Sequence, residues 1–183
     1  MIKESQEKYL ASLPDGKVIE VKPFDPRVRE VAESLMAQIK EALPDADLHF
    51  GGAAALEIAG QNDIDISILY DPADFDHYLS TLEKLFGKPS RTGTSPKNKS
   101  VKWEFKKDGF EVELYISLKS SPVSQEQIKV FELLSKNEGL RDAYEQTKLP
   151  YGQIDFKEYV RKKYEFFNKI LEDNPSEEGQ KQD

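Results

Sequence analysis

The sequence predicts a small α/β (α+β) domain, in which a mixed β-sheet is flanked by helices and followed by a helical C-terminal extension. Three observations predict it: strand-like stretches of alternating apolar and polar residues separate amphipathic helical stretches, Asp108-Gly109 joins two strands as a hairpin, and the last third of the chain has helical periodicity. The chain has 183 residues, of which 38% are hydrophobic and 33% charged. That suits one compact domain, or one domain with a small helical appendage.

The first quarter of the chain is expected to form a helix, a strand and a second helix. Residues 2–12 have helical character and end at Pro14-Asp15-Gly16, a strong turn signal, and residues 17–21 resemble a short strand. Asp25-Pro26 is typical of a helix start, and Pro44 ends the helix that follows. That helix has one apolar face, formed by Val28, Val31, Ala32, Leu35, Met36, Ile39 and Leu43.

The next stretch combines a glycine turn with a short helix and a half-buried strand. Residues 48–50 predict a brief strand that runs into Gly51-Gly52. Residues 53–59, closed by Gly60, are good helix formers and predict a two-turn helix. Residues 63–70 alternate strictly and predict a strand with one packed face. The packed face carries Ile64, Ile66 and Ile68, and the other face carries Asp63, Asp65 and Ser67.

A helix, a long loop and a hairpin complete the sheet region. Asp74 is expected to cap a helix over residues 75–86. Residues 87–100 predict an irregular loop that contains Lys and Arg residues but no acid, and such loops are often functional or disordered. In the hairpin, the return strand places Phe110, Val112, Leu114, Ile116 and Leu118 on one face and Glu111, Glu113, Tyr115 and Ser117 on the other.

The C-terminal third is expected to be helical. Ser124 with Gln127, and Asp155 with Glu158, have the spacing of capping boxes and predict two helix starts. The chain is therefore expected to divide into an N-terminal helical segment at 1–16, an α/β core at 17–120, a C-terminal helical extension at 121–172 and a disordered acidic tail at 173–183.

The composition excludes several classes of function. With no Cys and two His, the chain has no thiol chemistry and no multi-histidine metal site, so any metal would bind carboxylates, which favour hard ions such as Mg²⁺. No apolar stretch approaches the roughly 20 residues of a membrane span, and residues 1–6 lack the apolar core of a signal peptide. We therefore expect a cytoplasmic protein with no membrane partner. The net charge of −8 argues against broad nucleic-acid binding.

Three features of the sequence suggest chemistry. Gly51-Gly52 is a tight turn before a helix, where backbone amides can approach an anion. Asp63 and Asp65 lie on one strand face, roughly 7 Å apart, and their mutual repulsion favours a cation between them. Glu111 or Glu113 could complete a carboxylate trio for one or two Mg²⁺ ions. An ordinary turn, a solvated strand face and a solvent-facing hairpin would explain the same residues.

Together these pieces carry a resemblance. Phe50-Gly51-Gly52, ten intervening residues, Asp63-Ile64-Asp65 and the later Val112-Glu113-Leu114 resemble the signature of the DNA polymerase beta-type nucleotidyltransferase superfamily. Over roughly residues 17–172 the chain is also similar to the GrpB family, a branch of that superfamily. The similarity includes residues 18–26 at its start, and Tyr144, Lys148, Tyr159 and Lys162 near its end.

The resemblance implies a nucleotidyltransferase-like core that uses Mg²⁺ or Mn²⁺ and a nucleoside triphosphate. It implies that Asp63, Asp65 and Glu113 are catalytic residues and metal ligands, with Glu111 as the alternative third carboxylate. Gly51 and Gly52 would hold the nucleotide phosphates.

The chain departs from the family pattern at two places. Gly52 and Ala53 stand where GrpB-like chains usually carry Ser and Thr, and Gln61-Asn62 stands where they tend to carry Lys-Pro. Both changes weaken the expected hold on a triphosphate. Within the basic loop, Lys97 and Lys99 could replace that hold by forming a flexible cationic lid, although a solvated loop explains them as well.

The function expected from the sequence is transfer of a nucleoside monophosphate to a hydroxyl group of a small molecule or a protein. The alternative is a catalytically inactive module of the same fold that binds a nucleotide or a protein partner. A third possibility is a helical adaptor whose function lies in residues 124–171.

Overall fold

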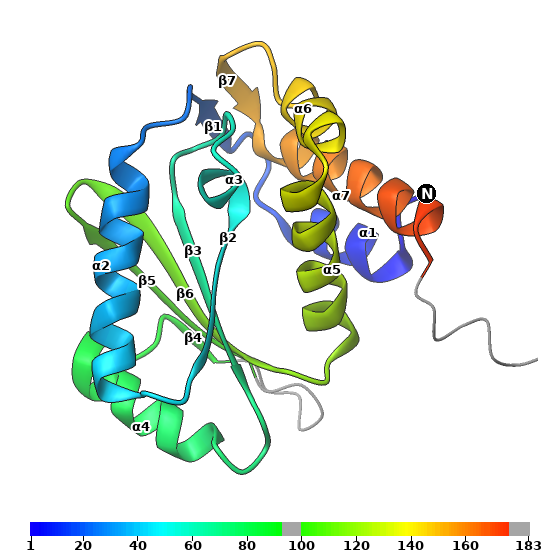
Figure 1. The fold of residues 1–183 in the computed structure, drawn as a ribbon. Coiled ribbons are helices and arrows are strands. Elements are labelled where there is room, and N and C mark those ends of the chain that lie inside the picture. The colour runs from blue at the N-terminus through cyan, green and yellow to red at the C-terminus, as the bar shows by residue number, and fades with distance from the viewer. Residues whose placement is uncertain (93–99, 176–183) are drawn as a thin grey trace, which may run out of the picture.

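The structure is a computed structural model that describes residues 1–92 and 100–175 (Figure 1). Its strands are β1 (Val18–Val21), β2 (Asp47–Gly51), β3 (Ile64–Tyr70), β4 (Arg91–Thr92), β5 (Val101–Lys107), β6 (Phe110–Leu118) and β7 (Gly152–Asp155). Five of them form one sheet in the order β2-β3-β6-β5-β4, and β1 pairs with β7 in a separate two-stranded sheet. The central sheet is mixed, because β3 and β6 are parallel and its other neighbours antiparallel.

Helices lie on both sides of the central sheet. They are α1 (Glu4–Ser12), α2 (Arg27–Ala42), α3 (Gly52–Ala55), α4 (Phe75–Phe86), α5 (Pro122–Lys136), α6 (Glu138–Gln146) and α7 (Phe156–Asp173). The helices α2 and α4 cover one face, whereas α5, α6 and α7 lie on the other side of the sheet with α1 against α7 (Figure 1). This arrangement is the expected α/β core with a C-terminal helical part.

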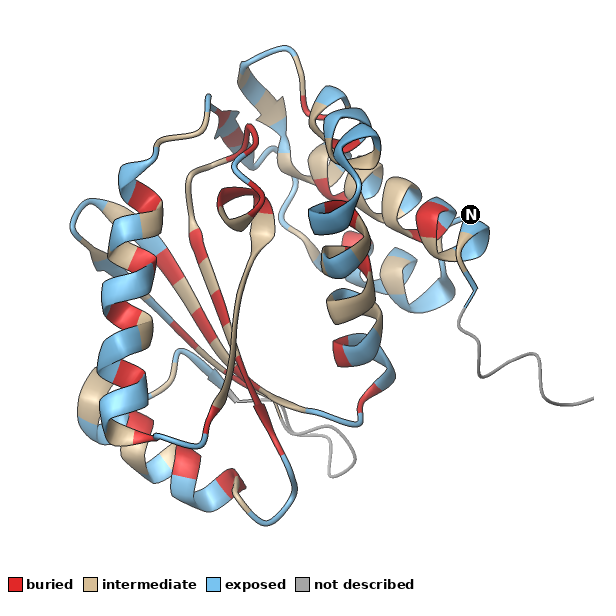
Figure 2. Cartoon of the chain, viewed as in Figure 1, coloured by how far each residue is buried: buried red, intermediate tan, exposed pale blue. Residues whose placement is uncertain are grey.

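Strand alternation decides which face of the sheet is packed. Ile64, Ile66 and Ile68 are fully buried under α2 and α4, and Trp103 of β5 lies in the same apolar cluster. Figure 2 shows buried and half-buried residues alternating along the strands, as period-2 side-chain orientation requires. The polar side chains of β3 and β6 are therefore left on the opposite face, toward the C-terminal helices.

The C-terminal helices attach to the core beside α3. Leu56 and Ile58, which follow α3, pack with Val130 and Leu134 of α5 and with Tyr144 of α6. This second apolar cluster fixes α5, α6 and α7 next to the end of β2, where the glycine turn begins.

The helix after the glycine turn is shorter than the sequence predicts. The expected two turns over residues 53–59 are a single turn, α3, because Glu57 adopts a left-handed φ of 59°. The chain then pairs with a distant segment: Lys22 and Gly60 exchange two backbone hydrogen bonds, of 2.8 and 3.0 Å. Helix propensity in this stretch is overridden by a non-local contact.

Three elements differ from the prediction for the C-terminal third. Ser124 does not cap α5; the cap is Ser121, whose Oγ accepts from the Ser124 amide at 3.1 Å, with Pro122 as the first helical residue. β7 and the separate helix α6 were not predicted. The second expected cap is confirmed, because Asp155 accepts from the Glu158 amide at 3.0 Å.

Two expectations fall partly or wholly outside the described residues. The basic-loop residues Lys97 and Lys99 lie in the segment 93–99, and most of the expected acidic tail lies in 176–183. Among the described helices, none has both the length and the apolar character that crossing a bilayer requires.

Candidate functional site

Pairing of three strands brings the predicted site residues together. Asp65 of β3 has Gly51 of β2 as its register partner on one side and Glu113 of β6 on the other. Asp63 directly precedes β3 on the same face as Asp65. Because neighbouring strands lie about 4.8 Å apart, the carboxyl groups of Asp65 and Glu113 are close neighbours across the parallel pair.

Gly52 begins α3 with no room for a side chain. Its φ is 73°, a conformation that residues with a Cβ rarely adopt, and a Cβ there would lie 2.2 Å from Oδ2 of Asp65. At Gly51 the nearest atom to such a Cβ is the backbone oxygen of Asp65, at 3.9 Å. Glycine at position 52 therefore lets the backbone turn directly against the Asp65 carboxyl group. Since α3 has only 4 residues, its dipole contributes little at this point.

The two aspartates are half-buried and electrostatically unfavourable as anions. Burial raises the pKa of both carboxyl groups, and the pKa of Asp65 reaches about 7 because the negative charge of Asp63 adds to the effect of burial. Glu113 raises both values further, whereas the positive charge of Lys163 opposes the shift. A cation at the aspartates would remove this penalty, so their oxygen donors fit a hard divalent ion such as Mg²⁺.

Glu113 makes its own contacts within the protein. Its Oε1 accepts from the Lys102 ammonium at 2.6 Å, and its Oε2 accepts from the Tyr115 hydroxyl at 2.5 Å. Burial and the Glu113 carboxylate raise the pKa of Tyr115 well above its usual value, so Tyr115 remains a donor. In the part of the chain that the structure describes, no three His, Cys, Asp or Glu side chains are already arranged around one metal position.

Glu111 lies outside this group. Its carboxylate pairs with Lys106 of β5 at 2.7 Å, and both side chains are exposed. Its charge is not among the main causes of the Asp63 and Asp65 pKa shifts, whereas that of Glu113 is. Of the two glutamates left open by the sequence, Glu113 is the neighbour of the aspartates.

Two lysines from the C-terminal helical part lie near enough for their charge to act on the aspartates. Lys148 follows α6 and is buried; its ammonium group donates to the Ala59 backbone oxygen at 3.0 Å and lies 4.1 Å from the centre of the Tyr144 ring. Burial lowers the pKa of Lys148 to about 7, and Lys163 of α7 lowers it further, whereas Asp63 opposes the shift.

The charges of the aspartates also affect the pKa of tyrosines in the helical part. Burial and the charges of Asp63 and Asp65 raise the pKa of Tyr159 well above its ordinary value. Tyr144, Lys148 and Tyr159 belong to the stretch that resembles the GrpB family, but helical periodicity alone did not indicate which residues face the sheet. Lys163 was not singled out; its neighbour Lys162 pairs instead with Glu158 at 2.8 Å.

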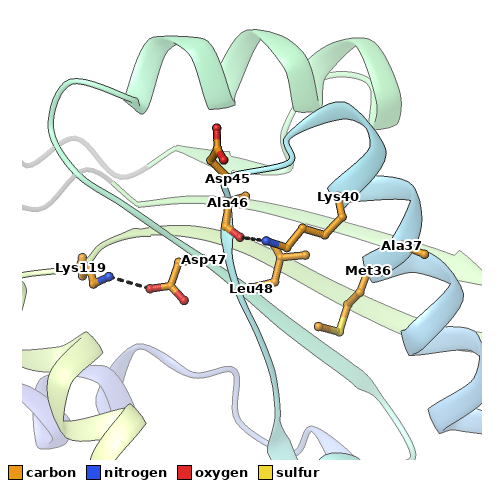
Figure 3. A pocket seen from close by; sticks show the side chains of 8 residues that line it. All are labelled: Met36, Ala37, Lys40, Asp45, Ala46, Asp47, Leu48 and Lys119. Carbon is orange, nitrogen blue, oxygen red and sulfur yellow. Dashed lines mark hydrogen bonds and ion pairs between the residues drawn. The ribbon is translucent and has the colours of Figure 1, made fainter.

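A separate hollow of about 530 Å³ lies at the opposite end of β2 (Figure 3). Both of its lysines are engaged within the lining: Lys40 donates to the Ala46 backbone oxygen at 2.6 Å, and Lys119 donates to Asp47 at 2.8 Å. None of the residues that line it is a residue of the predicted site. The carboxylate group at the other end of the strand is therefore the candidate site.

Comparison with known sequences identifies a family. A sequence model described as GrpB protein matches residues 18–173. No curated protein is similar enough in sequence to match.

Comparison with solved structures identifies the fold. A chain of the GLD-2/RNP-8 complex superposes with a TM-score of 0.53 and 13% identity, over 98% of this chain and 73% of that chain. Cid1, described with RNA terminal uridylyl transferase activity, gives a TM-score of 0.49 and 15% identity over 79% of this chain and 43% of that chain. The present chain thus spans less than half of Cid1.

A third similar structure is the polymerase core of TRAMP, an RNA surveillance complex, with a TM-score of 0.40 and 17% identity over 74% of this chain and 42% of that chain. At such identities the likeness shows the fold alone, and the fold is nucleotidyltransferase-like. The expectation of no broad nucleic-acid binding gains no support from these comparisons and stays a prediction.

Proposed function

The chain belongs to the GrpB family, and from this premise we propose that it is a divalent-metal-dependent nucleotidyltransferase. It would transfer a nucleoside monophosphate from a nucleoside triphosphate to a hydroxyl group of a small molecule or a protein. The observation that carries the proposal is the parallel pairing of Asp65 with Glu113, which joins carboxylates from two strands beside the Gly51-Gly52 turn.

The proposed reaction needs a cation, a base and a cradle for phosphates. Asp63 and Asp65 would hold Mg²⁺ or Mn²⁺, which when bound supplies charge neutralisation at the phosphates. Glu113 would accept the proton of the acceptor hydroxyl while that oxygen bonds to the α-phosphorus. The bond from the α-phosphorus to its bridging oxygen breaks, and pyrophosphate leaves. Catalysis is then positioning together with electrostatics.

The remaining charges of the site suit a triphosphate. Lys163, and Lys148 in its protonated form, bring positive charge to the aspartates from the helical side. Gly51 and Gly52 would hold phosphates on the sheet side, since the missing Cβ of Gly52 leaves backbone beside Asp65. Lys97 and Lys99 remain predicted contributors from the basic loop.

The test is pyrophosphate release from each of the four NTPs with Mg²⁺ or Mn²⁺, in the presence of small-molecule, protein and short RNA acceptors. We expect release that Glu113→Gln and Asp65→Asn each reduce by about 100-fold or more. Glu111→Gln is the matched control. It removes the same charge two residues before Glu113, and the carboxylate that it removes belongs to an exposed ion pair with Lys106. Equal loss in the two glutamate variants would contradict the assignment of Glu113.

An inactive module is the second candidate. The observation that favours it is the engagement of both Glu113 oxygens by Lys102 and Tyr115, together with the absence of hydroxyls at Gly52 and Ala53. Binding of a Mg²⁺-nucleotide that depends on Asp63 and Asp65, without pyrophosphate release from any NTP, would establish this second function and exclude the first.

A further inference from the structure

Lys102 enters the candidate site from the strand next to β6. Its register partner is Tyr115, so its side chain reaches diagonally to Glu113 on the same face. The ammonium nitrogen lies 2.6 Å from Glu113 Oε1 and 2.6 Å from Glu104 Oε1, and the side chain is 17% exposed. It also lies 5.3 Å from the centre of the Tyr115 ring. The position of this cation is therefore fixed by two carboxylates and an aromatic ring.

The charge of Lys102 acts on Asp65 as well as on Glu113. It is one of the positive charges that favour the ionised form of Asp65, with Lys163 on the helical side. The ammonium group lies between Glu113 and Glu104, on the β5 side of the third carboxylate, and it already compensates Glu113. Among the described residues, neither Asp63 nor Asp65 forms an ion pair of the kind that Glu113 forms with Lys102.

A second divalent ion at this position would meet a steric and electrostatic conflict. Paired metal ions in such sites lie about 3.5–4 Å apart and share carboxylate ligands. An ion bound to Glu113 Oε1 would lie within a few ångströms of the Lys102 nitrogen, and like charges at that distance repel strongly. The Tyr115 hydroxyl donates to Oε2 of Glu113, so a metal ion has no free access to that oxygen either.

We propose that Lys102 is a resident cation that takes the place of a second divalent ion, so that the site binds one divalent ion, at Asp63 and Asp65. This inference rests on the proposed function and adds the number of ions the site takes. Glu104 secures the arrangement, because it holds the ammonium group from the side of β5.

The test counts Mn²⁺ ions bound by the full chain, from the electron paramagnetic resonance signal of free Mn²⁺ during titration. We expect the wild type to bind one ion and Lys102→Met to bind two, with spin coupling between them in the variant. Lys102→Arg retains the charge and is expected to bind one. Lys106→Met is the matched control on the same strand, because its exposed pair with Glu111 lies outside the site; one bound ion is expected.

The outcomes separate this inference from the proposed function. A wild type that binds two ions overturns the inference and leaves the proposed function standing, whereas a wild type that binds none overturns the proposed function as well. One ion in both the wild type and Lys102→Met shows that Lys102 is not the cause, and also overturns the inference. Trp103 fluorescence reports whether each variant is folded, and Lys102→Gln replaces Lys102→Met if that variant is not.

Discussion

At Asp65, burial favours the protonated carboxyl group, whereas binding of a metal ion would require the ionised one. Its carboxyl group is surrounded by Asp63 and Glu113, which disfavour ionisation, and by Lys102 and Lys163, which favour it. Burial and the acidic neighbours prevail, and they raise its pKa to about 7 from an ordinary value of 3.8. A residue kept in this state lowers the stability of the metal-free protein at neutral pH.

The first prediction concerns the pH dependence of stability without metal. Between the unfolded pKa of 3.8 and the folded pKa of about 7, the folded chain holds a proton that the unfolded chain has lost. The free energy of unfolding therefore falls as pH rises through this window. Asp65→Asn reduces that fall, by up to about 4 kcal/mol between pH 4 and pH 8, and Asp63 accounts for the part that remains. Urea titrations in EDTA at several pH values measure the difference.

Asp47→Asn is the control with the opposite sign. The hydrogen bond from Lys119 lowers the pKa of Asp47, so this carboxylate stabilises the fold above its unfolded pKa and the contribution is lost as pH falls. If the free energy of unfolding changes with pH in the same way in the wild type and in Asp65→Asn, the prediction of a raised Asp65 pKa is wrong.

The second prediction concerns the glycine turn. Gly52→Ala combines a left-handed φ with a Cβ 2.2 Å from the Asp65 carboxyl oxygen. We expect it to lower the free energy of unfolding by about 1–3 kcal/mol and to weaken Mn²⁺ binding, because the Asp65 side chain must move. Gly51→Ala, with 3.9 Å of space, is the control and should change both much less. Thermal unfolding and Mn²⁺ titration measure the two effects.

At the scale of elements, α7 contributes to the candidate site from outside the sheet. Asp155 caps its start, and Val160 and Ile170 are buried, so its rotation relative to the sheet is fixed. The charge of Lys163 acts on the aspartates, whereas Lys162, one residue earlier, pairs with Glu158 along the same helix.

The third prediction compares these two lysines. Lys163→Met should weaken binding of a non-hydrolysable NTP analogue with Mg²⁺ by about tenfold or more, since a charge-assisted contact contributes roughly 1.5–3 kcal/mol. Lys162→Met removes the same charge from an ion pair within the helix and should change binding less than about twofold. Calorimetric titration measures both. Equal losses would show that α7 acts through its overall charge and not through a directed contact.

At the scale of the whole molecule, the apolar cluster beside α3 joins the sheet region to the C-terminal helices. It contains Ala53, Leu56 and Ile58 from one part and Leu134 and Ile170 from the other. The predicted division at residues 120 and 121 therefore separates two parts that share a core, and we expect them to unfold together.

The fourth prediction tests that cooperativity. Leu134→Ala removes a side chain that is 1% exposed and should lower the free energy of unfolding by about 2–5 kcal/mol. Trp103, the single tryptophan, lies in the other cluster, under α2 and α4. In Leu134→Ala, the urea midpoint of unfolding should fall by the same amount whether it is followed by Trp103 fluorescence or by helical circular dichroism. If the fluorescence transition stays at its wild-type position, the two parts unfold independently.

Much of the fold followed from local patterns. The alternation over residues 63–70 and the Asp108-Gly109 turn predicted β3 and the β5–β6 hairpin, and the spacing of apolar residues predicted α2 and α4. The end of α3 and the start of α5 were predicted wrongly, because a contact with Lys22 and a cap by Ser121 decide them. β7 was missed because residues 152–155 become a strand only by pairing with β1.

For the site, the sequence by itself determined which side chains share a strand face, since side-chain direction alternates with a period of two, and this placed Asp63 with Asp65 and Glu111 with Glu113. Only the tertiary structure decided that Glu113 stands beside Asp65, that Lys102 occupies its carboxylate, and that Lys148 and Lys163 approach from the helices. Strand register and helix rotation depend on packing between segments far apart in the chain, and no local pattern encodes them.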